Sequence, residues 1–142
     1  MSGASPRLAH AAGFTLLELM IVLAILAILA AVAYPSYQAQ VLKARRSDAT
    51  ATLMNLAQAL ERCYTESNDY TAPSCPSFPQ DSPEGHYTIN AAVSASTYLL
   101  RATPKAGSSQ AKDETCAVFT LDHTLRQQAR DKGGADTTGT CW

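Results

Sequence analysis

The sequence predicts an α+β protein, in which a long N-terminal helical spine, transmembrane in its first half, packs on a small antiparallel β-sheet head with two disulfides. Three observations lead to this prediction. An apolar run fills 14–34, a helix-favouring segment with one apolar stripe extends to residue 64, and short strand-like runs occupy the remainder. With 142 residues, the chain has room for one domain and an appendage.

The apolar run from Phe14 to Tyr34 contains only Thr15 and Glu18 as polar residues. A helix of about 20 apolar residues spans about 30 Å, which is the thickness of the hydrocarbon core of a bilayer. No other stretch of the sequence is long and apolar enough to do the same. We therefore expect a single membrane span.

An ordinary secretory signal is the alternative interpretation of this run. Ala31-Val32-Ala33 forms an A-x-A cleavage pattern directly before Tyr34. Against this interpretation, the run is longer than the 7–15-residue apolar region of a typical secretory signal, and the carboxylate of Glu18 lies near its start. These two features favour an anchor that is retained.

Beyond the span, the segment 36–64 favours a helix because it has no glycine, no proline and few β-branched residues. Its apolar stripe recurs at helical spacing, and consists of Leu53, Leu56, Ala57, Leu60 and Tyr64. The whole helix should run from about 14 to 64 and pack its stripe on a partner, because such a stripe is not stable in water alone. Pro35 lacks an N–H group and clashes with the carbonyl of Ala31, so we expect a kink there.

The C-terminal part supplies that partner. Four prolines in 65–85 indicate a loop, and short strand-like runs follow at Tyr87–Val93, Thr97–Thr103, Cys116–Leu121 and, more weakly, Thr124–Arg130. Turn-rich loops are expected at 105–114 and 132–140, with the adjacent acids Asp113 and Glu114 in solvent. Short connections favour an antiparallel meander laid on the helix stripe.

The four cysteines are Cys63, Cys75, Cys116 and Cys141. None is in a CxxC pair and the histidines lie far apart, so zinc-site spacing is absent. An even count in a small domain indicates two disulfides, which allow three connectivities. We favour the sequence-local pairs Cys63–Cys75 and Cys116–Cys141, and four buried free thiols remain the alternative.

The charges flanking the span and the cysteines indicate opposite orientations. Arg7 alone precedes the span whereas Lys43, Arg45 and Arg46 follow it, which would put the C-terminal part in the cytoplasm. Disulfides require an oxidising compartment, and a head this small needs their support. We therefore expect the head outside the cytoplasm and the three basic residues near lipid headgroups.

The residues Gly13-Phe14-Thr15-Leu16-Leu17-Glu18 resemble the class III signal of type IV pilins, in which a leader ends in glycine and is followed by phenylalanine and, four residues later, glutamate. Pro35 matches a proline that many pilins carry. Cys141-Trp142 resembles the end of PilE-type minor pilins. The resemblance implies a leader at 1–13, a transmembrane and assembly half of the helix at 14–35, an amphipathic half at 36–64, and an αβ-loop, sheet and C-terminal disulfide region at 65–142.

The resemblance also implies how this chain is processed and used. A prepilin peptidase/methylase would cut after Gly13 and methylate the amine of Phe14. The carboxylate of Glu18 would pair with the Phe14 ammonium of a neighbouring subunit during assembly. The protein would be a non-enzymatic minor subunit, first a single-pass inner-membrane protein with a periplasmic head and then part of a pilus. Its partners would be other pilins, the inner-membrane assembly platform and the membrane.

Two other functions remain open, namely a pseudopilin of a type II secretion system and a pilin-like DNA-uptake receptor. The net charge of −1 gives no electrostatic case for nucleic acid, and we expect none as a partner. The basic residues of the head are interleaved with acids along the sequence. Because no phosphate-binding loop, catalytic constellation or cofactor motif occurs, we expect no cofactor. The use of the pilus, in adhesion, twitching motility or uptake, stays open.

Overall fold

The computed structural model describes residues 13–142, and the chain forms two compact units that meet between Gln38 and Ala39 in the sequence. The leader predicted at 1–13 lies outside the described residues except for Gly13. The helix α1 (Leu16–Ser67) runs across the division between the units and contains Pro35. It begins and ends within three residues of the predicted bounds.

Polar residues at both ends set the length of α1. The hydroxyl of Thr15 accepts a hydrogen bond from the backbone N–H of Glu18 at 3.1 Å, which satisfies one of the unpaired donors of the first turn. At the other end, Asn68 has a φ of 56°, and its N–H donates to the carbonyl of Tyr64 at 2.7 Å. This is the left-handed conformation that commonly ends a helix.

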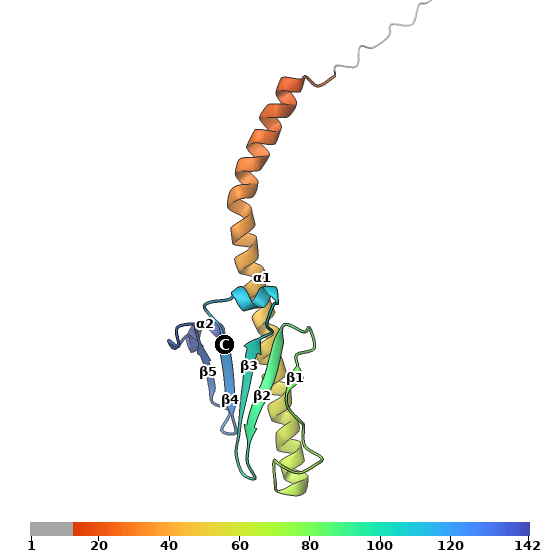
Figure 1. The fold of residues 1–142 in the computed structure, drawn as a ribbon, viewed down its shortest axis with the longest axis vertical. Helices are drawn as coiled ribbons and strands as arrows, with labels where there is room; N and C mark the ends of the chain where they lie inside the picture. Colours follow the sequence, from red (N-terminus) through yellow and green to blue (C-terminus); the bar gives the residue numbers. More distant parts are fainter. Residues whose placement is uncertain (1–12) are drawn as a thin grey trace, which may run out of the picture. The chain divides into compact units, whose positions relative to one another are not determined.

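The head contains a five-stranded antiparallel meander, in which each strand pairs with the next in the sequence (Figure 1). Its strands are β1 (Gln80–Asp81), β2 (Tyr87–Val93), β3 (Tyr98–Pro104), β4 (Val118–Asp122) and β5 (Gln127–Arg130). The predicted α+β class and antiparallel meander are therefore confirmed. The three main strands lie within two residues of the predicted runs.

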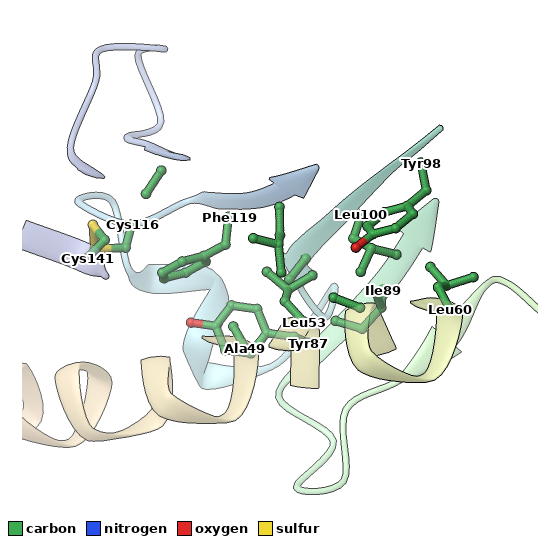
Figure 2. Packing of buried hydrophobic residues seen from close by; sticks show 14 of the residues in the cluster. Ala49, Leu53, Leu60, Tyr87, Ile89, Tyr98, Leu100, Cys116, Phe119 and Cys141 are labelled. Carbon is green, nitrogen blue, oxygen red and sulfur yellow. A yellow bond between two sulfur atoms is a disulfide. The ribbon is translucent and has the colours of Figure 1, made fainter. Parts of the chain in front are cut away.

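One face of this sheet packs against the second half of α1 (Figure 2). Ala49, Leu53 and Leu60 of α1 are completely buried, and together with Ala57 they meet the inward side chains of the sheet. Those side chains include Tyr87, Ile89, Leu100, Phe119 and Leu121. Since alternate residues of a strand point to opposite faces, the residues between them form the outer face of the sheet.

Three short elements lie where the sequence predicted only loops. They are β1, the 3₁₀ helix η1 (Ser109–Lys112) and α2 (Thr138–Cys141). Elements of two to four residues have too few positions to show a periodic pattern, and tertiary contacts fix them. The predicted strand Thr124–Arg130 is shorter at its start because the carboxylate of Asp122 accepts hydrogen bonds from the backbone N–H groups of Thr124 and Arg126 and forms a turn.

Two disulfides tie the loops of the head. They join Cys63 to Cys75 and Cys116 to Cys141, at sequence separations of 12 and 25. These are the two sequence-local pairs that the sequence analysis favoured, so the structure has the predicted connectivity. The first closes the loop after α1, and the second joins α2 to the segment before β4. On the chain-entropy estimate each contributes about 3 kcal/mol to the stability of the head.

Candidate functional site

The first described residues present the predicted processing and assembly positions. Among the described residues, a Cβ atom added to Gly13 would meet no heavy atom within 4 Å beyond its chain neighbours, and Phe14 is 89% exposed. Glu18 occupies the third position of α1, and its N–H is held by the hydroxyl of Thr15. The roles of Gly13, Phe14 and Glu18 in processing and assembly stay predictions.

The cap formed by Thr15 is a feature that the sequence reasoning missed. The pattern Thr15-Leu16-Leu17-Glu18 has the Thr-x-x-Glu spacing of a capping box, placed directly before an apolar run, and this signal was readable in the sequence. A carboxylate in the first turn also interacts favourably with the positive end of the helix dipole. The cap at Thr15 and the helix dipole therefore both favour a carboxylate at Glu18, at the start of an apolar helix.

The first unit exposes a continuous apolar surface. Within α1, an 18-residue window has a mean hydropathy of 2.9, and none of it is buried by the chain. Large apolar side chains from Leu16 to Val32 are at least 46% exposed. A surface of this size requires lipid or neighbouring apolar helices to cover it. Pro35 lies inside α1, and the predicted kink there stays a prediction.

In the second unit, a buried ion pair joins α1 to the loop that precedes β4. The guanidinium of Arg46 donates to both oxygens of Asp113, at 2.7 and 2.9 Å. The side chains of Arg46 and Asp113 are only 13% and 2% exposed. Asp113 also accepts the N–H of Cys116 at 3.2 Å, so the same carboxylate positions a disulfide cysteine.

This ion pair corrects two predictions. Asp113 was expected in solvent beside Glu114, and it is buried because Arg46 and two further donors compensate its charge. Arg46 was expected near lipid headgroups together with Lys43 and Arg45, but it is buried against Asp113. Arg45 donates to the hydroxyl of Ser109. The placement of Lys43 and Arg45 near lipid stays a prediction.

Gln110 extends this polar cluster into the core. Its side-chain amide is completely buried and donates to the hydroxyl of Tyr87 at 2.9 Å and to the carbonyl of Leu42 at 3.1 Å. Burial raises the pKa of Tyr87 to about 12, above its ordinary value of 10. The cluster therefore joins α1, η1 and β2 at a single point.

Asp48 makes a second polar junction on the buried side of α1. Its carboxylate accepts the hydroxyl of Ser82 at 2.5 Å and the backbone N–H groups of Glu84 and His86 at 3.3 and 3.4 Å. The hydroxyl of Ser82 in turn accepts the N–H of Tyr87 at 3.0 Å. Asp48 lies next to Ala49 on the buried face of α1. An acid at such a position indicates that this face of the helix needs polar partners.

The C-terminal aromatic residue also has a structural place. The ring of Trp142 packs edge to face on Phe119 with centroids 6.1 Å apart, and its indole N–H donates to the carbonyl of Gln128 at 2.9 Å. Trp142 therefore belongs to the packing of the head, together with the bridge at Cys141.

Two family descriptions match the sequence. Residues 8–34 match the prokaryotic N-terminal methylation motif, and residues 35–120 match the family described as type IV minor pilin ComP, DNA uptake sequence receptor. A methylation motif on an exposed apolar helix, followed by a head with an antiparallel sheet and two disulfides, defines a type IV pilin. More specifically, the chain belongs to the ComP family of type IV minor pilins. The predicted pilin identity is confirmed.

The solved structures that resemble the chain include two pilins. A type IV pilin from Shewanella oneidensis is 28% identical over 71% of this chain and 97% of its own, with a TM-score of 0.49. The non-core minor pilin PilV from Neisseria meningitidis is 22% identical over 68% of this chain and 93% of its own, with a TM-score of 0.52. At that identity, PilV supports the fold alone. None of the curated proteins matches the chain.

Proposed function

We propose that this type IV minor pilin is made as a prepilin, is cut between Gly13 and Phe14 and methylated at Phe14, and enters the pilus through the apolar half of α1. In the membrane stage, the segment 14–35 crosses the inner membrane and the head lies in the periplasm. The observation that carries the proposal is the uncovered apolar surface of α1, which lies within the residues that match the methylation motif, 8–34.

Glu18 has a defined part in this proposal. A charged side chain at the centre of a bilayer costs about 3 kcal/mol, and less near the end of a helix. In the filament, the Glu18 carboxylate would bind the methylated ammonium of Phe14 on a neighbouring subunit, which would offset this cost. An ion pair at a fixed depth would also set the axial register between adjacent subunits.

N-terminal sequencing and intact mass of the membrane-derived protein test the processing step. The expected chain begins at Phe14 and carries one additional methyl group. A chain that begins at Tyr34 would show that the Ala31-Val32-Ala33 site is used, and would overturn the proposal. A chain that retains residues 1–13 would do the same.

The proposal assigns a structural role to the protein and no catalysis. Cleavage and methylation are reactions of a prepilin peptidase/methylase on this chain, and an inner-membrane assembly platform would place it among other pilins. Within residues 13–142, no three metal-ligating side chains lie close enough to hold an ion. The family match favours the pilus over a type II secretion pseudopilin. Counting copies by quantitative mass spectrometry of sheared pili tests the minor stoichiometry.

A second candidate function is reception of DNA at the filament surface. The observation that favours it is the family description, which names a DNA uptake sequence receptor. It would revise the expectation of no nucleic-acid partner. Deletion separates the two candidates, because loss of piliation indicates a role in biogenesis, whereas normal pili with lost DNA uptake indicate a receptor.

A further inference from the structure

Three side-chain contacts join η1 and the residue that follows it to one short stretch of α1. The amide of Gln110 donates to the carbonyl of Leu42 at 3.1 Å, and the guanidinium of Arg45 donates to the hydroxyl of Ser109. The buried ion pair of Arg46 is the third contact. Together they hold η1 against α1 (Figure 1). We call this surface the collar, and it consists of residues 42–46 and 109–113.

The collar concentrates positive charge. It holds four basic residues and one acid, which gives it a net charge of +3 in a chain whose net charge is −1. Arg46 and Asp113 neutralise each other. The remaining charge belongs to Lys43, Arg45 and Lys112, none of which forms an ion pair within residues 13–142. Lys43 and Lys112 are exposed, and Arg45 is half-buried.

The two lysines outside the collar are placed differently. Lys105 lies 2.5 Å from Asp81, and Lys132 lies 3.3 Å from Glu114. The sequence contains four lysines in all. The two in the collar are therefore the ones that, in the part of the chain that the structure describes, are left to bind an anion from outside.

The collar follows the proposed membrane segment closely along the chain. Lys43 comes eight residues after Pro35, where that segment ends, and α1 includes both. At 1.5 Å per residue, eight residues of helix extend over at most about 12 Å. The headgroup layer adds about 5–8 Å to each side of a bilayer core, and a charged surface acts over about another 10 Å. Lys43 is therefore within reach of headgroup charges.

We propose that the collar binds the phosphate groups of anionic phospholipids in the periplasmic leaflet of the inner membrane, before the protein enters the filament. The inference rests on the proposed function and adds to it a lipid class and a second membrane contact. A guanidinium forms paired hydrogen bonds with phosphate, and an ammonium binds it as a point charge. A lysine or arginine near an anionic membrane strengthens attraction to it about fivefold, so three cations give about a hundredfold.

Lipid binding at the collar would also orient the head. The amide of Gln110 donates to the hydroxyl of Tyr87 at 2.9 Å, so η1 is connected to β2 as well as to α1. A headgroup held by Lys112 would therefore fix the sheet, and not only the helix, relative to the membrane. Entry into the filament would break these contacts, since the protein then leaves the lipid.

The experiment measures the acetylation rate of each lysine by mass spectrometry. The full chain is reconstituted in nanodiscs of phosphatidylcholine alone or of equal parts phosphatidylcholine and phosphatidylglycerol, because both faces of a nanodisc are open to the reagent. Lys43 and Lys112 should react about fivefold more slowly in the anionic nanodiscs, the factor expected for one cation. Lys105 and Lys132 should react at equal rates in both.

The four lysines also provide a matched pair of variants. Lys43→Gln/Lys112→Gln and Lys105→Gln/Lys132→Gln each remove two positive charges from the head. The first variant should retain several-fold less phosphatidylglycerol than the unaltered chain after extraction from mixed nanodiscs into detergent, and the second should retain as much. Each variant is accepted only if its two disulfides and its thermal unfolding match those of the unaltered chain.

The other outcomes overturn the inference in different ways. Equal rates for Lys43 and Lys112 in the two nanodiscs would show that the collar binds no anionic lipid, while the proposed membrane segment stands if the chain elutes with both. Equal slowing of all four lysines would indicate general attraction to a charged surface and no collar. Slowing of Lys43 and Lys112 by inorganic phosphate in neutral nanodiscs would assign the collar to a free anion. A chain that elutes apart from the nanodiscs would overturn the proposed function and this inference together.

Discussion

Replacing Asp113 with alanine should destabilise the head severely, because it removes one half of a buried ion pair. Asp113 is 2% exposed and Arg46 13% exposed, so the variant leaves the guanidinium with little access to water. Breaking a buried pair by removing one partner costs about 3–5 kcal/mol. The lost hydrogen bond to the N–H of Cys116 adds to this loss.

A surface pair in the same head serves as the matched control. Lys105 and Asp81 are 2.5 Å apart, but both side chains are about half exposed, at 48% and 49%. Solvent screening limits such a pair to about 0–1 kcal/mol. Asp81→Ala should therefore lower the free energy of unfolding by less than a third of the loss in Asp113→Ala.

The assay is urea unfolding of the oxidised full chain in detergent, followed by tryptophan fluorescence. Trp142 is the sole tryptophan of the sequence and packs on Phe119 in the head, so its emission reports the head alone. The double variant Arg46→Met/Asp113→Leu should recover part of the lost stability, because neither charge remains buried. Equal losses in Asp113→Ala and Asp81→Ala would refute this reasoning.

Three further predictions concern assembly, the disulfides and pH. Glu18→Ala should keep cleavage and both disulfides but be absent from sheared pili by immunoblot, and normal incorporation would remove the carboxylate from the proposed mechanism. Loss of Cys116–Cys141 should lower the free energy of unfolding more than loss of Cys63–Cys75, because it closes the longer loop, with a separation of 25 against 12, and unfolding in urea decides. Because burial raises the pKa of Tyr87 to about 12, the unfolded chain loses this proton first, and Tyr87 alone should lower stability between pH 10 and 12 by about 1.4 kcal/mol per pH unit. Tyr70 and Tyr98 should add to this decline, because burial raises their pKa values as well. Tyr87→Phe should show a shallower decline, and an equal decline would assign it to other groups.

Periodicity predicted the parts of the fold that repeat. The stripe of Leu53, Ala57 and Leu60 is buried as expected, and the alternation in Tyr87–Val93 gave the bounds of β2. In such segments, one repeating requirement, an apolar face against a core, acts on every residue. Its trace in the sequence is therefore long enough to be recognised.

Contacts between residues far apart in the sequence produced no comparable pattern. Arg46 and Asp113 are 67 positions apart, and nothing near either one identifies the other. Asp113 was therefore expected in solvent, where an acid in a polar loop usually lies. Burial of a charge depends on a partner that only the folded chain supplies, and a sequence read segment by segment does not contain it.

The outer face of the sheet needed one more level of information, the register between strands. Asn90, Arg101, Thr120 and Gln128 are spread over 39 positions of the sequence, and strand pairing places them in one row across that face. A slip of one residue in any strand would turn its residue into the core. Which polar residues lie together on this face is therefore decided by the pairing of the strands, which the sequence analysis did not contain.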